Sequence, residues 1–158
     1  MKYHKLSAAE LEPLEAEFIK FLIVQGLDGS DWNKIKANEP NEAEAVMEQF
    51  SDMVIERSLL NIKYLELIMD KAIYTFQCAE TEIKLNAMTI DSDSAFSFSK
   101  DTSIEHIQGL LANDALRVNV FTQTKSYQPD RNSELYGMLN NQFSISDGVW
   151  FTAIEKLI

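Results

Sequence analysis

The sequence is poor in the residues that most often build catalytic and metal sites. Its 158 residues include a single cysteine, Cys78, and two distant histidines, His4 and His106. A lone cysteine allows no disulfide within the chain, and no histidine or cysteine follows another at the three- or four-residue spacing of a helical zinc site. We therefore expect no metal, no cofactor and no catalytic nucleophile with its base, and we interpret Cys78 as a small core residue.

Glycine, basic charge and long apolar runs are also scarce. The five glycines are not clustered, which argues against a glycine-rich phosphate loop and a doubly wound nucleotide-binding fold. The 14 basic residues are outnumbered by 25 acidic ones, and the resulting net charge of −11 repels nucleic acids and anionic membranes. The longest apolar run, residues 18–24, is too short to cross a bilayer. The sequence thus predicts neither nucleic-acid nor membrane binding, and its single cysteine and lack of an N-terminal signal segment predict a cytoplasmic location.

What remains is the composition of an ordinary globular protein. Apolar residues make up 46% of the chain and charged residues 25%, which is enough apolar content to offset the entropy of ordering the chain. We find no internal repeat and no linker-like stretch. We therefore expect a single domain over residues 1–158.

The first third of the chain has the spacing of helices. Pro13 predicts either a kink or a short turn at 7–11 followed by a main helix, which Gly26 ends. A short helix over 32–37 and a long helix from Pro40 follow.

Beyond residue 60 the spacing changes to the alternation of strands. Residues 73–78 and 83–88 alternate in this way and predict a hairpin with its turn at Glu80. Residues 61–69 fit a third strand or a continuation of the helix, and we favour the strand. The later expectations are a loop or edge strand over 91–103, a helix over 104–112, a strand over 116–124, and helices over 131–141 and 147–157. The order predicts an α+β fold, in which N-terminal helices precede a mostly antiparallel sheet of about four strands with C-terminal helices.

Two groups of polar residues are candidates for a binding site. Lys125, Tyr127, Arg131 and Glu134 combine cationic, phenolic and carboxylate groups around the start of an expected helix, although helix capping by Asp130 is the simpler interpretation. They could bind an anionic metabolite and move a proton.

Asp52 and Glu56 lie one helical turn apart and could bind a cation or a basic partner, or form an ordinary solvated face. Trp32 and Trp150 follow aspartate-containing helix starts, where a tryptophan either packs against the core or anchors a partner.

Several short sets of residues carry a resemblance to a known family. They are Asp31, Trp32, Lys34, Ile35 and Lys36; Pro40; Phe50, Ser51, Asp52, Val54 and Glu56; Tyr64, Leu65 and Glu66; Val118, Val120, Phe121, Lys125, Tyr127, Asp130 and Glu134; and Ile145, Ser146, Gly148 and Phe151. In this order the chain resembles a family of short bacterial cytoplasmic proteins classed only as a domain of unknown function. The resemblance implies one intact domain and implies no activity, substrate or cofactor.

Three functional hypotheses follow. The first is a non-catalytic cytoplasmic protein-binding or adaptor protein, which associates with itself or with a basic partner through the N-terminal helices and the tryptophan-containing turns. The second is a small enzyme or anionic-metabolite-binding protein. It would use Lys125, Tyr127, Arg131 and Glu134 together with Asp52 and Glu56. The third is an acidic secretion-type chaperone, which requires a stable dimer.

Overall fold

The structure is a computed structural model that describes residues 1–158. The chain divides into an N-terminal unit, Met1–Leu60, and a C-terminal unit, Asn61–Ile158. Each unit has its own secondary structure and its own buried cluster of side chains. The single domain expected from the sequence stays a prediction.

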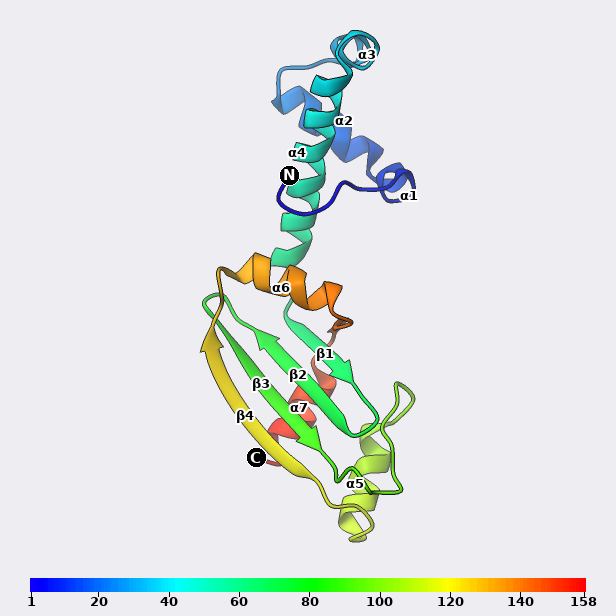
Figure 1. The fold of residues 1–158 in the computed structure, drawn as a ribbon, viewed down its shortest axis with the longest axis vertical. Helices are drawn as coiled ribbons and strands as arrows, with labels where there is room; N and C mark the ends of the chain where they lie inside the picture. Colours follow the sequence, from blue (N-terminus) through cyan, green and yellow to red (C-terminus); the bar gives the residue numbers. More distant parts are fainter. The chain divides into compact units, whose positions relative to one another are not determined.

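The N-terminal unit is entirely helical. Its elements are α1 (Ala8–Leu11), the 3-10 helix η1 (Glu12–Leu14), α2 (Glu15–Val24), α3 (Gly29–Asn38) and α4 (Pro40–Leu60) (Figure 1). Pro13 lies in the first turn of η1, where its missing N–H is not needed, so a short element precedes the main helix as predicted. Gly26 follows α2 with a φ of 79°, a left-handed conformation that glycine adopts without strain, and it ends the helix as expected.

Aromatic side chains form the core of this unit. Phe18 lies edge-on to Phe50 and Trp32, with ring centroids 5.0 and 5.2 Å apart respectively. Phe21 packs on Phe50 at 5.5 Å. These contacts place the apolar stripe of α2 against α4, and Phe50 is completely buried.

The C-terminal unit is built on an antiparallel sheet. Its strands are β1 (Tyr64–Ile68), β2 (Ala72–Cys78), β3 (Glu82–Thr89), β4 (Asn119–Ser126) and β5 (Ser144–Ser146), in the order β4-β3-β2-β1-β5. The strand that we favoured over a helix at 61–69 is confirmed as β1, and the hairpin is confirmed as β2 and β3. Strand β4 begins three residues later than expected and continues to Ser126.

The sheet has five strands rather than about four, because β5 was not predicted. This strand is only three residues long, which is too short for alternation to be visible in the sequence. It forms because Ser144 and Ser146 pair with Glu66 and Tyr64 of β1. The α+β class is confirmed.

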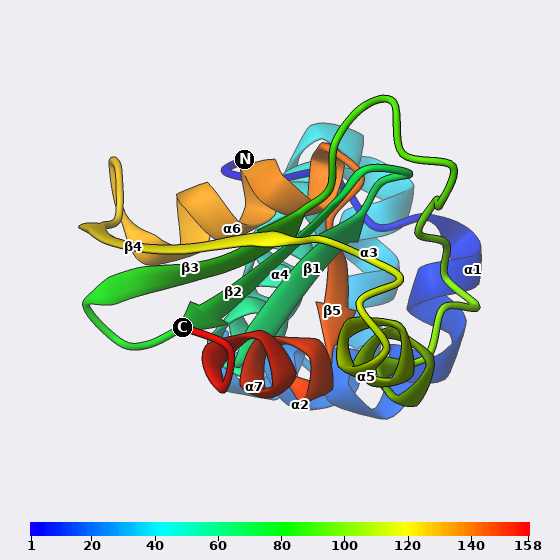
Figure 2. The same cartoon turned by 90° about the horizontal axis from the view of Figure 1, so that it is seen from below.

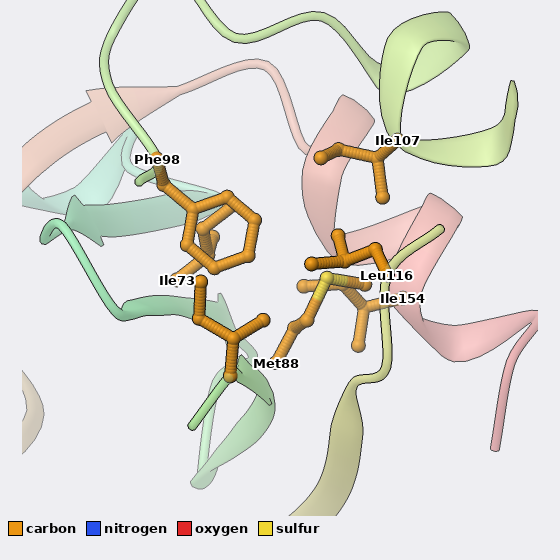
Figure 3. Packing of buried hydrophobic residues seen from close by; sticks show 7 residues of the cluster. Ile73, Met88, Phe98, Ile107, Leu116 and Ile154 are labelled. Atoms are coloured by element: carbon orange, nitrogen blue, oxygen red, sulfur yellow. The ribbon is translucent and has the colours of Figure 1, made fainter. Parts of the chain in front are cut away.

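Helices cover both faces of this sheet. Figure 2 shows α6 (Arg131–Asn140) on one face, and α7 (Val149–Glu155) and α5 (Ile104–Ala112) toward the other. Between the sheet, α5 and α7 lies a cluster that includes Ile73, Met88, Ile107 and Ile154 (Figure 3). Residues 91–103 form a loop without strand structure, which adds the buried Phe98 to this cluster.

Candidate functional site

The predicted residues around the start of α6 lie together in the C-terminal unit, and Arg131 is at their centre. Its Nη2 donates to the carbonyl oxygen of Ile62 at 2.6 Å and more weakly to that of Cys78 at 3.4 Å. Its Nε donates to the carbonyl oxygen of Ala79 at 3.1 Å. One guanidinium thus joins α6 to the start of β1 and the end of β2, and we call this arrangement the carbonyl clamp.

The other three predicted side chains complete the clamp. The Tyr127 hydroxyl donates to the carbonyl oxygen of Ala79 at 2.7 Å. Glu134 accepts from the backbone N–H of Gln128 at 2.8 Å and pairs with Lys125 Nζ at 2.5 Å. Burial raises the pKa of Tyr127 to about 12, so this phenol stays protonated as a donor. The contacts are structural, and a role of these four residues in ligand binding stays a prediction.

Two residues beside the clamp behave as the simpler interpretations expected. Asp130 caps α6 by accepting from the backbone N–H of Ser133 at 2.9 Å. Cys78 is buried, and this burial raises the pKa of its thiol to about 11. The thiol is therefore held in its protonated, unreactive form at neutral pH.

Asp52 and Glu56 belong to the N-terminal unit, where they hold the first residues of the chain against α4. The two Asp52 carboxylate oxygens accept from the backbone N–H groups of Lys2 at 2.6 Å and Tyr3 at 2.9 Å. Glu56 pairs with Lys2 Nζ at 3.5 Å. Both acidic residues also line a hollow of about 510 Å³ whose walls come from α4 alone.

The two tryptophans are both partly buried, and each packs within its own unit. Trp32 lies edge-on to Phe18, and Lys36 Nζ lies 5.8 Å from the centre of its ring. Trp150 packs against the cluster that contains Ile154. Both tryptophans thus pack against a core, which is one of the two roles predicted for them. Trp150 also contacts a surface hollow.

Trp150 also lines a hollow of about 520 Å³ at the β5 edge of the sheet. Its polar lining is contributed by Glu66 of β1, Lys100 of the 91–103 loop, Gln142 of the turn after α6, and Ser144 of β5. We call this site the Trp150 hollow. Apart from Trp150, none of its residues was predicted as a site residue from the sequence. Glu66, which was named only for the family resemblance, is the one charged residue within the apolar strand Tyr64–Ile68, and this position could have indicated a site.

The environment of Glu66 differs from that of an ordinary surface carboxylate. Burial raises the pKa of Glu66 above its usual value and the nearby Asp147 charge raises it further, while a hydrogen bond with Ser146 opposes this shift. Asp147 itself accepts from the backbone N–H of Val149 at 3.1 Å. The carboxylate of Glu66, which lines the hollow, thus lies near that of Asp147, which follows β5.

Comparison with known proteins identifies a family for the chain. A model of the family of unknown function DUF6495 matches residues 1–158. The chain belongs to this family. The match spans both units and confirms that the chain resembles a family of unknown function over its whole length. No curated protein and no solved structure is similar enough to match it.

Two further structural features of this DUF6495 member bear on its chemistry. No three side chains of histidine, cysteine, aspartate or glutamate are grouped so that they could hold a metal ion. None of the helices combines the length and the apolar character needed to cross a membrane.

Proposed function

We propose that this protein is a non-catalytic protein-binding protein that associates with a second copy of itself through the edge strand β4. The single observation that carries the proposal is the exposed outer edge of this strand. Figure 1 shows β4 as the outermost strand of the sheet, and seven of its eight residues are exposed.

The backbone of β4 has unpaired groups along this edge. The carbonyl oxygen of Glu82 in β3 accepts from the backbone N–H of Ala79, which follows β2, so the backbone groups of Glu82 face β2. Backbone groups alternate in direction along a strand, so those of Ile83 and of every second residue after it face β4. The register pairs Ile83 with Lys125 and Leu85 with Gln123. By the same alternation, the N–H and C=O groups of the even-numbered residues of β4 point away from the sheet. These residues are Val120, Thr122, Thr124 and Ser126.

The two edges of the sheet are protected to very different degrees. Strand β5 is three residues long and is followed by a left-handed turn at Gly148. Strand β4 is eight residues long, contains no proline, and pairs regularly with β3 along its whole length. Natural proteins usually block such an edge with charges, bulges or proline, because it can otherwise pair with another chain.

A second copy fits this edge without placing like charges opposite each other. In an antiparallel pair of β4 strands about a two-fold axis, Thr122 of one copy can lie opposite either Thr122 or Thr124 of the other copy. Lys125 is the only charged residue of the strand and is neutralised by Glu134. Pairing would also bury Phe121, which is 44% exposed.

The oligomeric state tests the proposal. We expect sedimentation equilibrium to show a concentration-dependent dimer that strengthens with salt, because each copy carries a net charge of −11. Substitution of both Thr122→Lys and Thr124→Lys places lysines opposite each other in either alignment and should abolish the dimer. The matched control, Thr122→Val with Thr124→Val, keeps the backbone donors and should preserve it.

Helix α2 offers the comparison for the N-terminal interface predicted from the sequence. It exposes Ile19, Ile23 and Val24. An Ile19→Glu and Ile23→Glu variant should keep the β4 dimer. Dissociation by this variant alone, or a wild-type monomer at up to about 1 mM, contradicts the proposal. A stable dimer is also what the secretion-chaperone hypothesis requires.

The cytoplasmic location is part of the same proposal. It is supported by the single cysteine, which is buried as a protonated thiol and forms no disulfide. Fractionation of the native cells should recover the protein with cytoplasmic markers, and recovery in a secreted or membrane fraction would contradict this location.

A further inference from the structure

We propose that the Trp150 hollow binds a free α-amino acid with an apolar side chain. The hollow brings together side chains from β1, the 91–103 loop, the turn after α6, β5 and α7, which are distant in the sequence. Its volume of about 520 Å³ lies within the range of about 300–1,000 Å³ that is usual for small-molecule sites.

The polar groups that line the hollow are available to a ligand. The Lys100 ammonium makes no ion pair or hydrogen bond, and the side chains of Gln142 and Ser144 make no hydrogen bond. The Trp150 indole N–H is likewise unpaired. Lys100, Gln142 and Ser144 are exposed to solvent, so a ligand that enters the hollow can reach all three by displacing water.

The charges of the lining determine the class of ligand. Glu66 and Lys100 carry opposite charges, both line the hollow, and they form no ion pair with each other. Asp147 adds negative charge near Glu66. A ligand with an ammonium and a carboxylate group satisfies both ends at once: the ammonium pairs with Glu66 and the carboxylate pairs with Lys100.

The apolar part of the lining determines the side chain of the ligand. Ile68 and Trp150 are both partly buried and present apolar surface to the hollow. An aliphatic or aromatic side chain of the ligand would cover this surface, and the burial of apolar area would stabilise the complex. Gln142 and Ser144 offer further hydrogen bonds to the ammonium and carboxylate groups.

Matched ligands test the two charge contacts separately. In a Trp32→Phe protein, Trp150 is the only indole, so a change in its fluorescence reports on the hollow. We expect leucine to change this fluorescence. N-acetyl-leucine, which lacks the ammonium, and leucinamide, which lacks the carboxylate, should each bind about tenfold more weakly, because each loses one charge-assisted contact.

Variants of the hollow then identify the residue behind each contact. Glu66→Gln should weaken leucine binding about tenfold and remove the preference for leucine over N-acetyl-leucine. Lys100→Met should remove the preference over leucinamide instead. Glu82→Gln, which removes the same charge from an exposed position on β3, is the matched control and should bind as the parent protein does.

Calorimetry provides a readout that does not depend on the indole. The proposal is overturned if leucine gives neither heat nor a fluorescence change at up to about 10 mM. It is also overturned if both hollow variants keep the preferences of the parent protein. If Glu66→Gln does not fold, Glu66→Asp keeps the charge and should retain the preference for leucine over N-acetyl-leucine.

Discussion

The carbonyl clamp and the Trp150 hollow contain the same kinds of side chain but use them in opposite ways. In the clamp, Arg131 and Tyr127 donate to backbone carbonyl oxygens, and Glu134 accepts from a backbone N–H. In the hollow, Lys100 and Gln142 make no such contacts. Residue type alone therefore does not reveal a binding site; what matters is whether the hydrogen-bonding capacity has been used within the fold.

This difference predicts that, within the C-terminal unit, the clamp contributes to stability and the hollow contributes to ligand binding. Substitutions in the clamp remove contacts on which the fold depends, and should lower the free energy of unfolding. Substitutions of the polar side chains of the hollow should change stability little and ligand binding strongly. The turn that supports the hollow is the exception, because its backbone conformation is demanding.

Gly148→Ala should have the largest effect on stability. Gly148 has a φ of 82°, and an added methyl group would lie 2.6 Å from Cε2 of the Tyr64 ring. The left-handed backbone and the displaced ring together should cost about 3 kcal/mol in urea unfolding. Gly109→Ala is the control, since no atom lies within 4 Å of its added methyl group and α5 should become slightly more stable. Equal effects of the two substitutions would contradict the importance of this turn.

Arg131→Met should have the next largest effect. It leaves the carbonyl oxygens of Ile62, Cys78 and Ala79 without their charged donor, and the loss should cost about 2 kcal/mol in urea unfolding. Arg131→Lys keeps the charge but not the planar fork, so it should restore only part of this loss. A full restoration of stability by lysine would show that the positive charge stabilises the unit, rather than the guanidinium geometry that reaches three carbonyl oxygens.

Sequence patterns predicted most of the fold because its elements are long or clearly bounded. The alternation in β2 and β3 and the proline and glycine around α2 were sufficient to place these elements. Strand β5 was missed because three residues carry no detectable alternation and depend on pairing with β1. Tertiary contacts, rather than local propensity, form this strand.

The candidate site was predicted only in part for a related reason. Lys125, Tyr127, Arg131 and Glu134 are close in sequence, and they do come together in the structure. The residues of the Trp150 hollow come from five separate segments, and only the fold brings them to one place. A sequence can indicate local clusters, whereas a cavity requires the topology.

Glu66→Gln tests the electrostatics of the hollow through the pH dependence of stability. Burial and Asp147 raise the pKa of Glu66, so the folded protein holds this proton more tightly than the unfolded chain does. Its contribution is fully present below the ordinary carboxyl pKa and is lost as the pH rises through the raised pKa. The neutral glutamine side chain of the variant avoids this loss, so the variant should gain stability relative to the parent as the pH rises above the ordinary carboxyl pKa of 4.5. The exposed Glu82→Gln control should show no such gain in urea unfolding.

Lys100→Met and Lys125→Met compare the two regions with one chemical change, and their effects on stability should be the smallest. Lys125 neutralises Glu134, whose side chain is only 14% exposed, so its loss should cost up to about 1 kcal/mol, an amount limited by the 56% exposure of Lys125 itself. Lys100 has no partner to lose, and its substitution should change the free energy of unfolding by less than about 0.5 kcal/mol. Urea unfolding of both variants decides the matter. A larger effect at Lys100 than at Lys125 would mean that the hollow, like the clamp, uses its cation to hold the fold together, and the distinction between the two regions would then be lost.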